Sequence, residues 1–294
     1  MPLGHQLALW FICLIWAGNF LASAWAVKTL PPITATVLRF ALVLLLLLRW
    51  LRPPERSQWP WLVAACWCVG AAHFGLLFIA LGRSQDISSI ALLMQVYVPI
   101  STLLAALLLG ERIGWRTASG IALAFSGVLV VGLDPLVLAQ LDVLGLVLCS
   151  AFFLALGTIL MRRVQGVGVF QFQAWNAALA LLPLGALALW REQPQAIAWT
   201  RTIHGPALLA VVYSAIGASI IGHGTFYWLL QRHPVGLITP TLMLVPLLAV
   251  GLGVLVHGDR PGTRVLIGGA MIIAGVLWVT LRARKRRRAV PVVE

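Results

Sequence analysis

The chain has 294 residues, of which 61% are hydrophobic and 10% charged, and its mean hydropathy is +0.98. A soluble globular domain is about 45–50% apolar and about 25% charged, so this composition excludes an ordinary soluble enzyme. Almost every segment is apolar all round, which is typical of helices that are solvated by lipid. We therefore expect an all-α integral membrane protein.

The formal net charge of +13 comes partly from a basic cluster directly after the last apolar segment, namely Arg282, Arg284, Lys285, Arg286, Arg287 and Arg288. A basic cluster beside a membrane span contacts anionic lipid or fixes orientation. Outside the apolar segments there is no basic groove with interleaved aromatic residues, so we expect the lipid bilayer and no nucleic acid as a partner. All four cysteines lie inside apolar segments, where they read as packing residues, and we expect no metal and no cofactor.

Apolar runs, ended by proline and glycine, predict ten spans. No Lys or Arg precedes Lys28, so the first run is interpreted as a span and not as a cleaved signal. The predicted spans are 6–27, 33–52, 60–81, 87–109, 114–132, 142–161, 168–190, 205–230, 235–256 and 264–281.

The distribution of Lys and Arg between alternate loops predicts the orientation. If the N-terminus is cytoplasmic, fourteen of these residues lie on the inner side and six on the outer side, with Arg39 inside the second span. The positive-inside rule then favours a multi-pass protein of a bacterial-type inner (plasma) membrane with both termini in the cytoplasm.

The two halves of the chain resemble each other. Val98-Pro99, followed by an apolar run to Gly110-Glu111-Arg112, recurs as Val245-Pro246 followed by Gly258-Asp259-Arg260. Further on, Arg116, Gly120 and Gly127 match Arg264, Gly268 and Gly275 at a constant offset of 148 residues. We expect five-helix repeats over 1–136 and 137–281, followed by a basic cytoplasmic tail over 282–294. Because five is odd, the second repeat is inverted in the membrane, which is a transporter architecture.

These motifs resemble the drug/metabolite transporter superfamily in its ten-helix, EamA-like form. The resemblance rests on Pro32 to Arg39-Phe40, on Pro99 to Gly110-Glu111-Arg112, on Gly120 and Gly127, and on the second-half echo, which has Asp259 where the family usually has Glu. It implies an exporter or exchanger of small polar metabolites, with amino-acid exporters as the nearest branch. It also implies a central cavity lined mainly by the first, third, fourth, sixth, eighth and ninth spans.

Polar and aromatic residues inside the spans are the candidates for substrate binding, since a buried amide or ionisable group needs a partner in the protein, in water or in a ligand. The histidines titrate near neutral pH and are candidates for proton coupling, although each could instead bond to a neighbouring helix. The predicted substrate-binding residues are Trp16, Asn19, His73, Phe74, Phe78, Gln95, Tyr97, Tyr213, His223 and Tyr227.

A second set of residues is predicted to act in structure or gating. Arg39 either snorkels or makes a structural bond, or it contacts a substrate carboxylate. Pro99 and Pro246 remove backbone donors inside spans, so their helices can bend. Glu111 and Asp259 are expected to hold tight helix ends and to pair with nearby cations.

All eight acidic residues fall at span ends, in loops or at the C-terminus, so the chain lacks a catalytic constellation and is not expected to be an enzyme. We predict a transporter that exports a small metabolite, most simply a hydrophobic or aromatic amino acid, by alternating access. The alternatives are an exporter of drugs, nucleotide sugars or other metabolites, and a non-transporting membrane sensor. Gly120/Ala124 and Ala270/Ala274 permit close helix packing within one bundle or between protomers, so a monomer and a homodimer both stay open.

Overall fold

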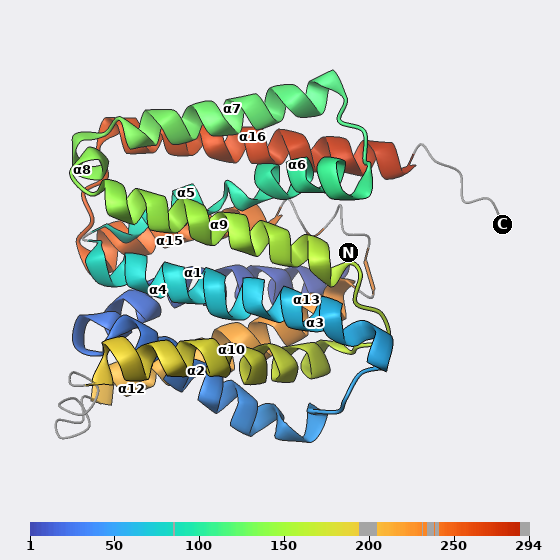
Figure 1. Cartoon of the computed structure of the whole chain (residues 1–294). Coiled ribbons are helices and arrows are strands. Elements are labelled where there is room, and N and C mark those ends of the chain that lie inside the picture. The colour runs from blue at the N-terminus through green and yellow to red at the C-terminus, as the bar shows by residue number, and fades with distance from the viewer. Residues whose placement is uncertain (85, 194–204, 231, 234–237, 239–240, 289–294) are drawn as a thin grey trace.

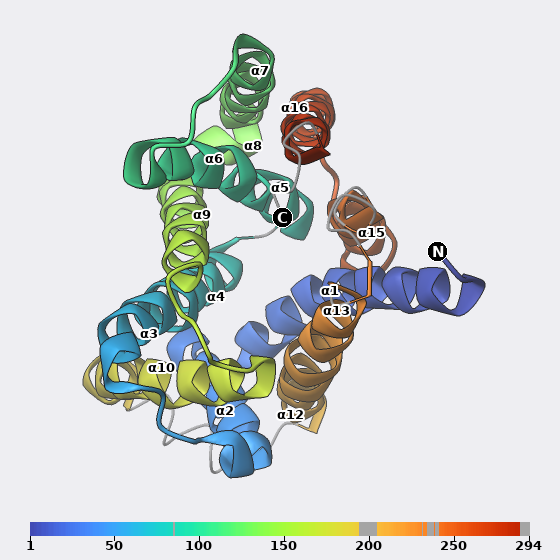
Figure 2. The same cartoon turned by 90° about the vertical axis from the view of Figure 1, so that its right-hand side faces the viewer.

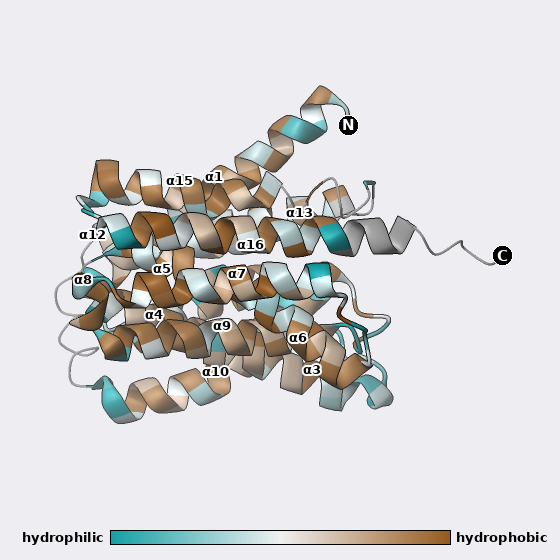
Figure 3. Ribbon diagram, turned by 90° about the horizontal axis from the view of Figure 1, so that it is seen from above, coloured by the Kyte–Doolittle hydropathy of each residue, from teal (hydrophilic) through white to brown (hydrophobic). Residues whose placement is uncertain are grey.

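The computed structural model describes residues 1–84, 86–193, 205–230, 232–233, 238 and 241–288. Every regular element within these ranges is a helix. Nine of the described helices are long and apolar enough to cross a membrane, and a shorter apolar helix, Thr241–His257, occupies the place of the remaining span. The helices run side by side (Figure 1), with hydrophobic residues along their middles and hydrophilic residues toward their ends (Figure 3). The fold is that of an all-α membrane protein.

The first five spans follow the predicted order, with breaks inside the third and the fourth. The elements are α1 Leu3–Thr29, α2 Pro32–Leu47 continued by η1 Leu48–Trp50, η2 Arg56–Gln58, α3 Trp59–Cys66, η3 Trp67–His73, α4 Phe74–Arg83, α5 Ile87–Met94, α6 Tyr97–Leu109 and α7 Trp115–Gly132. The face of the molecule at which α1 begins is called the N-side below, and the other face is called the far side.

The second half repeats this alternation after a short helix in the connection. Its elements are α8 Pro135–Leu138, α9 Leu141–Met161, α10 Val169–Arg191, α12 Gly205–Val212, η4 Tyr213–Gly222, α13 His223–Leu230, η5 Thr241–Met243, α15 Leu244–Leu252, η6 Gly253–His257 and α16 Thr263–Arg288. The start of the predicted span 235–256 lies largely outside the described residues. Helix α16 continues to Arg288 instead of ending near 281, since no glycine or proline interrupts the basic cluster.

Two kinds of irregularity interrupt the spans. The third and eighth spans each contain a π-helical segment, η3 and η4, where the backbone takes a wider turn. The fourth span is broken between α5 and α6, directly before Pro99, whose ring nitrogen cannot donate a hydrogen bond. Pro246 likewise lies in the first turn of α15, which η5 precedes.

Corresponding helices of the two halves pair with each other. The most extensive helix contacts in the described structure are those of α7 with α16 and of α2 with α10. Figure 2 shows these two pairs at opposite ends of the molecule, with the other helices between them. The fifth span therefore packs on the tenth, and the second on the seventh.

Four glycines bring α7 and α16 into backbone contact, and we call this contact the glycine seam. A Cβ atom on Gly127 would lie 2.5 Å from the carbonyl oxygen of Gly268, and one on Gly275 would lie 2.6 Å from that of Gly120. The contacts are reciprocal, because Gly120 and Gly127 correspond in sequence to Gly268 and Gly275. Gly120 and Ala124, which the sequence predicts to permit close packing, thus pack within the chain. Ala270 and Ala274 are exposed instead, because α16 turns Gly268 and Gly275 toward α7.

Candidate functional site

A central cavity of about 390 Å³ lies among the helices. It is lined by residues of α1, α2, η3, α4, α9, α10, η4, α13 and α15, and by the break between α5 and α6. Seven of the ten predicted binding residues line the cavity: Trp16, Asn19, His73, Phe74, Gln95, Tyr97 and His223. Arg39, from the set predicted for structure or gating, lines it as well. The second and seventh spans also line it, in addition to the six spans that the resemblance implied.

The remaining predicted binding residues do not line this cavity. Phe78 is 1% exposed in the apolar core. The hydroxyl of Tyr213 donates a hydrogen bond to the carbonyl oxygen of Ile15 at 3.0 Å, which fixes α1 against η4. Tyr227 belongs to α13, but its side chain lies outside the described part of the chain.

Several cavity side chains make bonds between helices as well. The Nδ1 atom of His73 lies 2.8 Å from the Oγ atom of Ser150 on α9, and that hydroxyl donates to the carbonyl oxygen of His73 at 2.9 Å. The hydroxyl of Ser214 donates to the Oδ1 atom of Asn19 at 2.6 Å. The indole of Trp16 donates to the carbonyl oxygen of Ala218 at 3.2 Å. From the sequence alone, lining the cavity and bonding to a neighbouring helix are alternative roles for these residues. In the structure, the same residues do both.

Among the described Lys and Arg side chains, only that of Arg39 lines the cavity. It is 2% exposed, and its Nη2 and Nε atoms donate to the hydroxyl of Ser219 at 3.0 and 3.4 Å. Its guanidinium carbon lies 4.2 Å from the centre of the Phe74 ring, a cation–π contact. The Nη1 atom has no hydrogen-bond partner. Within the described residues, no carboxylate lines the cavity or pairs with Arg39, so its positive charge is unbalanced there.

Two amides of α10 also lie in the cavity wall with unsatisfied atoms. Gln173 and Asn176 are each 9% exposed and lie three residues apart, on one face of the helix. Both polar atoms of the Gln173 amide and the Oδ1 atom of Asn176 lack hydrogen-bond partners. Neither amide is among the binding residues predicted from the sequence, because an amide near the start of a span resembles an ordinary interfacial residue.

The cavity extends to the N-side. Its lining includes Met161, the last residue of α9, and Val169, the first residue of α10, and both helix ends lie on that face. Toward the far side the lining stops at Phe20 in α1 and Leu77 in α4, well before those helices end at Thr29 and Arg83.

On the far side, Asp259 connects the two halves. The backbone N–H and the hydroxyl of Ser88, at the start of α5, donate to the Oδ2 atom of Asp259 at 2.8 and 2.7 Å. The Nδ1 atom of His257 lies 2.7 Å from its Oδ1 atom. We call this group of contacts the Asp259 clamp. A Cβ atom on Gly253 would fall on both the Asp259 carboxylate and the Ser88 hydroxyl, so a glycine is required beside the clamp.

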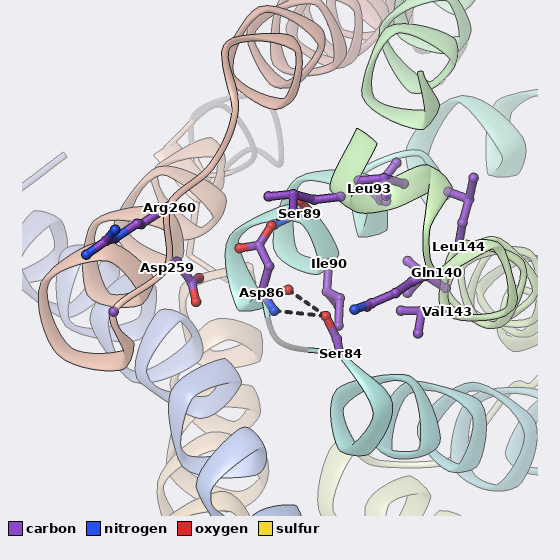
Figure 4. Close-up of a pocket in the computed structure, with 14 residues that line it drawn as sticks. Ser84, Asp86, Ser89, Ile90, Leu93, Gln140, Val143, Leu144, Asp259 and Arg260 are labelled. Carbon is purple, nitrogen blue, oxygen red and sulfur yellow. Dashed lines mark hydrogen bonds between the residues drawn. The ribbon is translucent and has the colours of Figure 1, made fainter. Parts of the chain in front are cut away.

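A second cavity of about 230 Å³ lies beside the clamp and is lined by Asp86, Ser89, Asp259 and Arg260 among others (Figure 4). Asp86 caps α5, accepting hydrogen bonds from the backbone N–H groups of Ser88 and Ser89 at 3.0 and 3.2 Å and from the Ser89 hydroxyl. Burial, together with the neighbouring Asp259 carboxylate, raises the pKa of Asp86 to about 6. Burial acts in the same direction on Asp259, but hydrogen bonds from His257 and Ser88 outweigh it and hold the pKa of Asp259 below its usual value.

Glu192 makes a similar contact at the other far-side helix start. Its Oε1 atom accepts from the backbone N–H of Ile33 at 2.9 Å, and its Oε2 atom accepts from the N–H and the hydroxyl of Thr34 at 2.7 and 2.9 Å. A residue that follows α10 thereby satisfies the free N–H groups of α2 and adds a negative charge at its N-terminus. The sequence showed only an acidic loop residue, because its partner lies 158 residues away.

Apart from Arg39, the residues predicted for structure or gating lie at helix ends and breaks. Gly110 and Gly258 end their helices with positive φ angles of 67° and 85°, and the next residues, Glu111 and Asp259, make equivalent backbone bonds to Ala105 and Gly253. The Glu111 side chain pairs with Arg162 at 2.8 Å on the N-side, where both side chains are nearly half exposed. The repeated motif thus ends a helix and lets the following carboxylate bond to a neighbouring segment, Arg162 for Glu111 and Ser88 for Asp259.

The chain is similar to known transporters over its whole length. The model of the EamA-like transporter family matches residues 5–133 and again residues 143–281. A protein of Escherichia coli described as a "Probable amino-acid metabolite efflux pump" is 26% identical, and the match covers 96% of each chain. A "Probable terminal-alkyne amino-acid exporter" of Streptantibioticus cattleyicolor is 28% identical over 81% of this chain and 78% of its own.

A solved crystal structure shares the fold. It superposes with a TM-score of 0.63 at 21% sequence identity, covering 97% of this chain and 99% of the other. Two family matches that together span nearly all of the sequence, on a bundle of membrane-spanning helices around a cavity, identify a membrane transporter. The chain belongs to the EamA-like transporter family.

Proposed function

We propose that this transporter exports amino acids, or small metabolites that resemble them, through the central cavity. The observation that carries the proposal is a cavity that is closed on the far side by contacts between the halves and reaches the N-side at the ends of α9 and α10. Its volume of about 390 Å³ lies within the range of small-molecule sites, about 300–1,000 Å³. One relative is described as a probable amino-acid metabolite efflux pump and another as a probable terminal-alkyne amino-acid exporter, and both descriptions support this substrate class.

Transport would proceed by alternating access between two inverted repeats, 1–136 and 137–281. Three observations support the repeats: the sequence offset of 148 residues, one family match in each half, and the reciprocal contacts of the glycine seam. In the seam, Gly127 contacts Gly268, and their counterparts in the other half, Gly275 and Gly120, contact each other in the same way. A two-fold axis that relates the halves produces such paired contacts. Two inverted halves give conformations of similar energy that open to opposite faces.

We further propose that the N-side faces the cytoplasm of a bacterial-type inner membrane, with both termini inside. The excess of Lys and Arg on that side supports this orientation. The described conformation is then the one in which an exporter takes up its substrate from the cytoplasm. One chain supplies the whole cavity, so it is the transport unit whether the protein is a monomer or a homodimer.

The test is counterflow in proteoliposomes. Vesicles are loaded with each of the common amino acids in turn, and the uptake of the same labelled amino acid is followed. We expect exchange of a subset that includes hydrophobic or aromatic amino acids. The matched control is Ala218→Trp, which places a large ring in the cavity wall and should abolish exchange in folded protein. Exchange that survives this control, or silence of the wild type across all amino acids, would refute the proposal.

A further inference from the structure

The described lining of the central cavity contains a positive charge and no carboxylate that balances it. Arg39 is almost fully buried, and within the described residues its hydrogen bonds go to the neutral hydroxyl of Ser219 alone. A buried charge is costly unless it is paired, and a guanidinium is shaped to bind a carboxylate through two parallel N–H groups. Its Nη1 atom remains without a partner.

The rest of the guanidinium is held in place. Ser219 binds it from η4, and the ring of Phe74 covers it from α4. A side chain fixed on two sides loses little conformational freedom when a ligand binds, so its free N–H groups are preorganised.

The two α10 amides offer the complementary atoms. Gln173 and Asn176 carry unpartnered carbonyl oxygens in the wall of the same cavity. Carbonyl oxygens accept hydrogen bonds from an ammonium group. Because α10 packs on α2, both amides lie on the helix next to the one that carries Arg39. Buried polar groups left without partners in a folded protein call for an explanation, and a ligand supplies one for all three residues.

We propose that Arg39 binds the carboxylate of the substrate and that the amides of Gln173 and Asn176 receive its ammonium group. The inference rests on the proposed function and deepens it, because it assigns recognition of the zwitterion to particular residues. The aromatic and aliphatic wall around these groups receives the side chain of the amino acid. The absence of a carboxylate in the described lining fits this assignment, since a lining carboxylate would compete for Arg39.

The test compares the amino acid that exchanges fastest in the panel with its α-amide and with its decarboxylated amine. Each compound competes with counterflow in wild type and in Arg39→Gln. In wild type the acid should compete much better than the amide or the amine. In Arg39→Gln, loss of a buried charge pair should lower the apparent affinity for the acid by at least about 30-fold and bring the acid-to-amide ratio close to one.

Further variants separate binding from folding. Arg39→Lys keeps the positive charge and should retain part of the discrimination. Ser219→Ala keeps the guanidinium but removes one of its two supports, so it should weaken exchange less than Arg39→Gln does. Gln173→Met with Asn176→Leu should instead reduce discrimination against the deaminated acid. Melting curves of all variants show whether they fold.

The outcomes are distinguishable. Silence of the wild type with every amino acid overturns the proposed function and the inference with it. Exchange that retains the full preference for acid over amide in folded Arg39→Gln overturns the inference alone and leaves the amino-acid exporter standing.

Discussion

Removing the carboxylate of the Asp259 clamp should open the far side of the cavity. In Asp259→Ala, the hydroxyl of Ser88 and the ring of His257 lose their partner, whereas the backbone N–H of Ser88 keeps its bond to Asp86. Hydrogen bonds to a charged group contribute about 1.5–3 kcal/mol each, but bonds that share one carboxylate are not additive. We therefore expect the closed conformation to lose about 2–4 kcal/mol, a shift of about 30- to 700-fold in the conformational equilibrium.

Accessibility of a cysteine in the cavity measures this shift. In a background without the four native cysteines, Phe20→Cys places a thiol in the cavity wall toward the far side. A membrane-impermeant thiol reagent is added to intact cells and to inverted vesicles, which present opposite faces. Asp259→Ala should speed labelling from the far side and slow it from the N-side.

The matched control is Asp142→Ala, which removes another far-side carboxylate. Asp142 pairs with Arg83 at 3.0 Å, but both side chains are more than half exposed, and such pairs contribute about 0–1 kcal/mol. Its labelling should therefore change less than about fivefold. Equal labelling rates in Asp259→Ala and Asp142→Ala would show that the clamp does not hold the far side closed.

Three further predictions concern the far side and the glycine seam. Glu192→Gln should lower the melting temperature by a few degrees, since a neutral amide caps α2 with about 1–2 kcal/mol less stabilisation; an unchanged melting curve would contradict this. Because the pKa of Asp86 is raised to about 6 when the far side is closed and would be near its ordinary value in water, the closed state gains stability as pH falls through 6 and loses it above. Labelling of Phe20→Cys from the far side, divided at each pH by the labelling rate of the same thiol in unfolded protein to remove the titration of the thiol, should thus be slower at pH 5 than at pH 7.5. Asp86→Asn should abolish this difference, and equal normalised rates at both pH values in the parent would contradict the prediction. Gly127→Ala should lower the free energy of unfolding by about 1–3 kcal/mol, because the added methyl group overpacks the seam. Gly145→Ala, where a Cβ meets open space, should be neutral or slightly stabilising in the same denaturation series. Equal effects of the two variants would exclude backbone contact as the reason.

The architecture could be predicted because lipid imposes a strong pattern on sequence. Apolar runs of spanning length, with breakers between them, located the helices, and an ionisable residue within such a run drew attention to Arg39, His73 and His223. All three line the cavity. The breaks within spans were harder to predict. Pro99 indicated a bend in the fourth span, but nothing in the local sequence of η3 or η4 distinguishes a π-helical turn from an α-helical one.

Other parts of the site depend on contacts that no local pattern shows. Phe78 and Tyr213 lie in spans that are apolar all round, so periodicity could not tell which face each presents. Asp86 and Glu192 look like ordinary loop acids, and their roles arise only when the far-side helix ends meet. The positions of Gln173 and Arg39 in one cavity follow from the packing of α10 on α2, which joins segments more than a hundred residues apart.

The glycine seam also has a mechanical consequence. Its contacts are between backbones, so no rotamer change can absorb a displacement there. We therefore expect the seam to be the pivot when the two halves rotate. A rotation of one half about this pivot moves each helix in proportion to its distance from α7 and α16. The α2–α10 pair lies at the opposite end of the molecule, so its far-side termini would travel furthest (Figure 2). The far-side opening would then be wider near Glu192 than near Asp259.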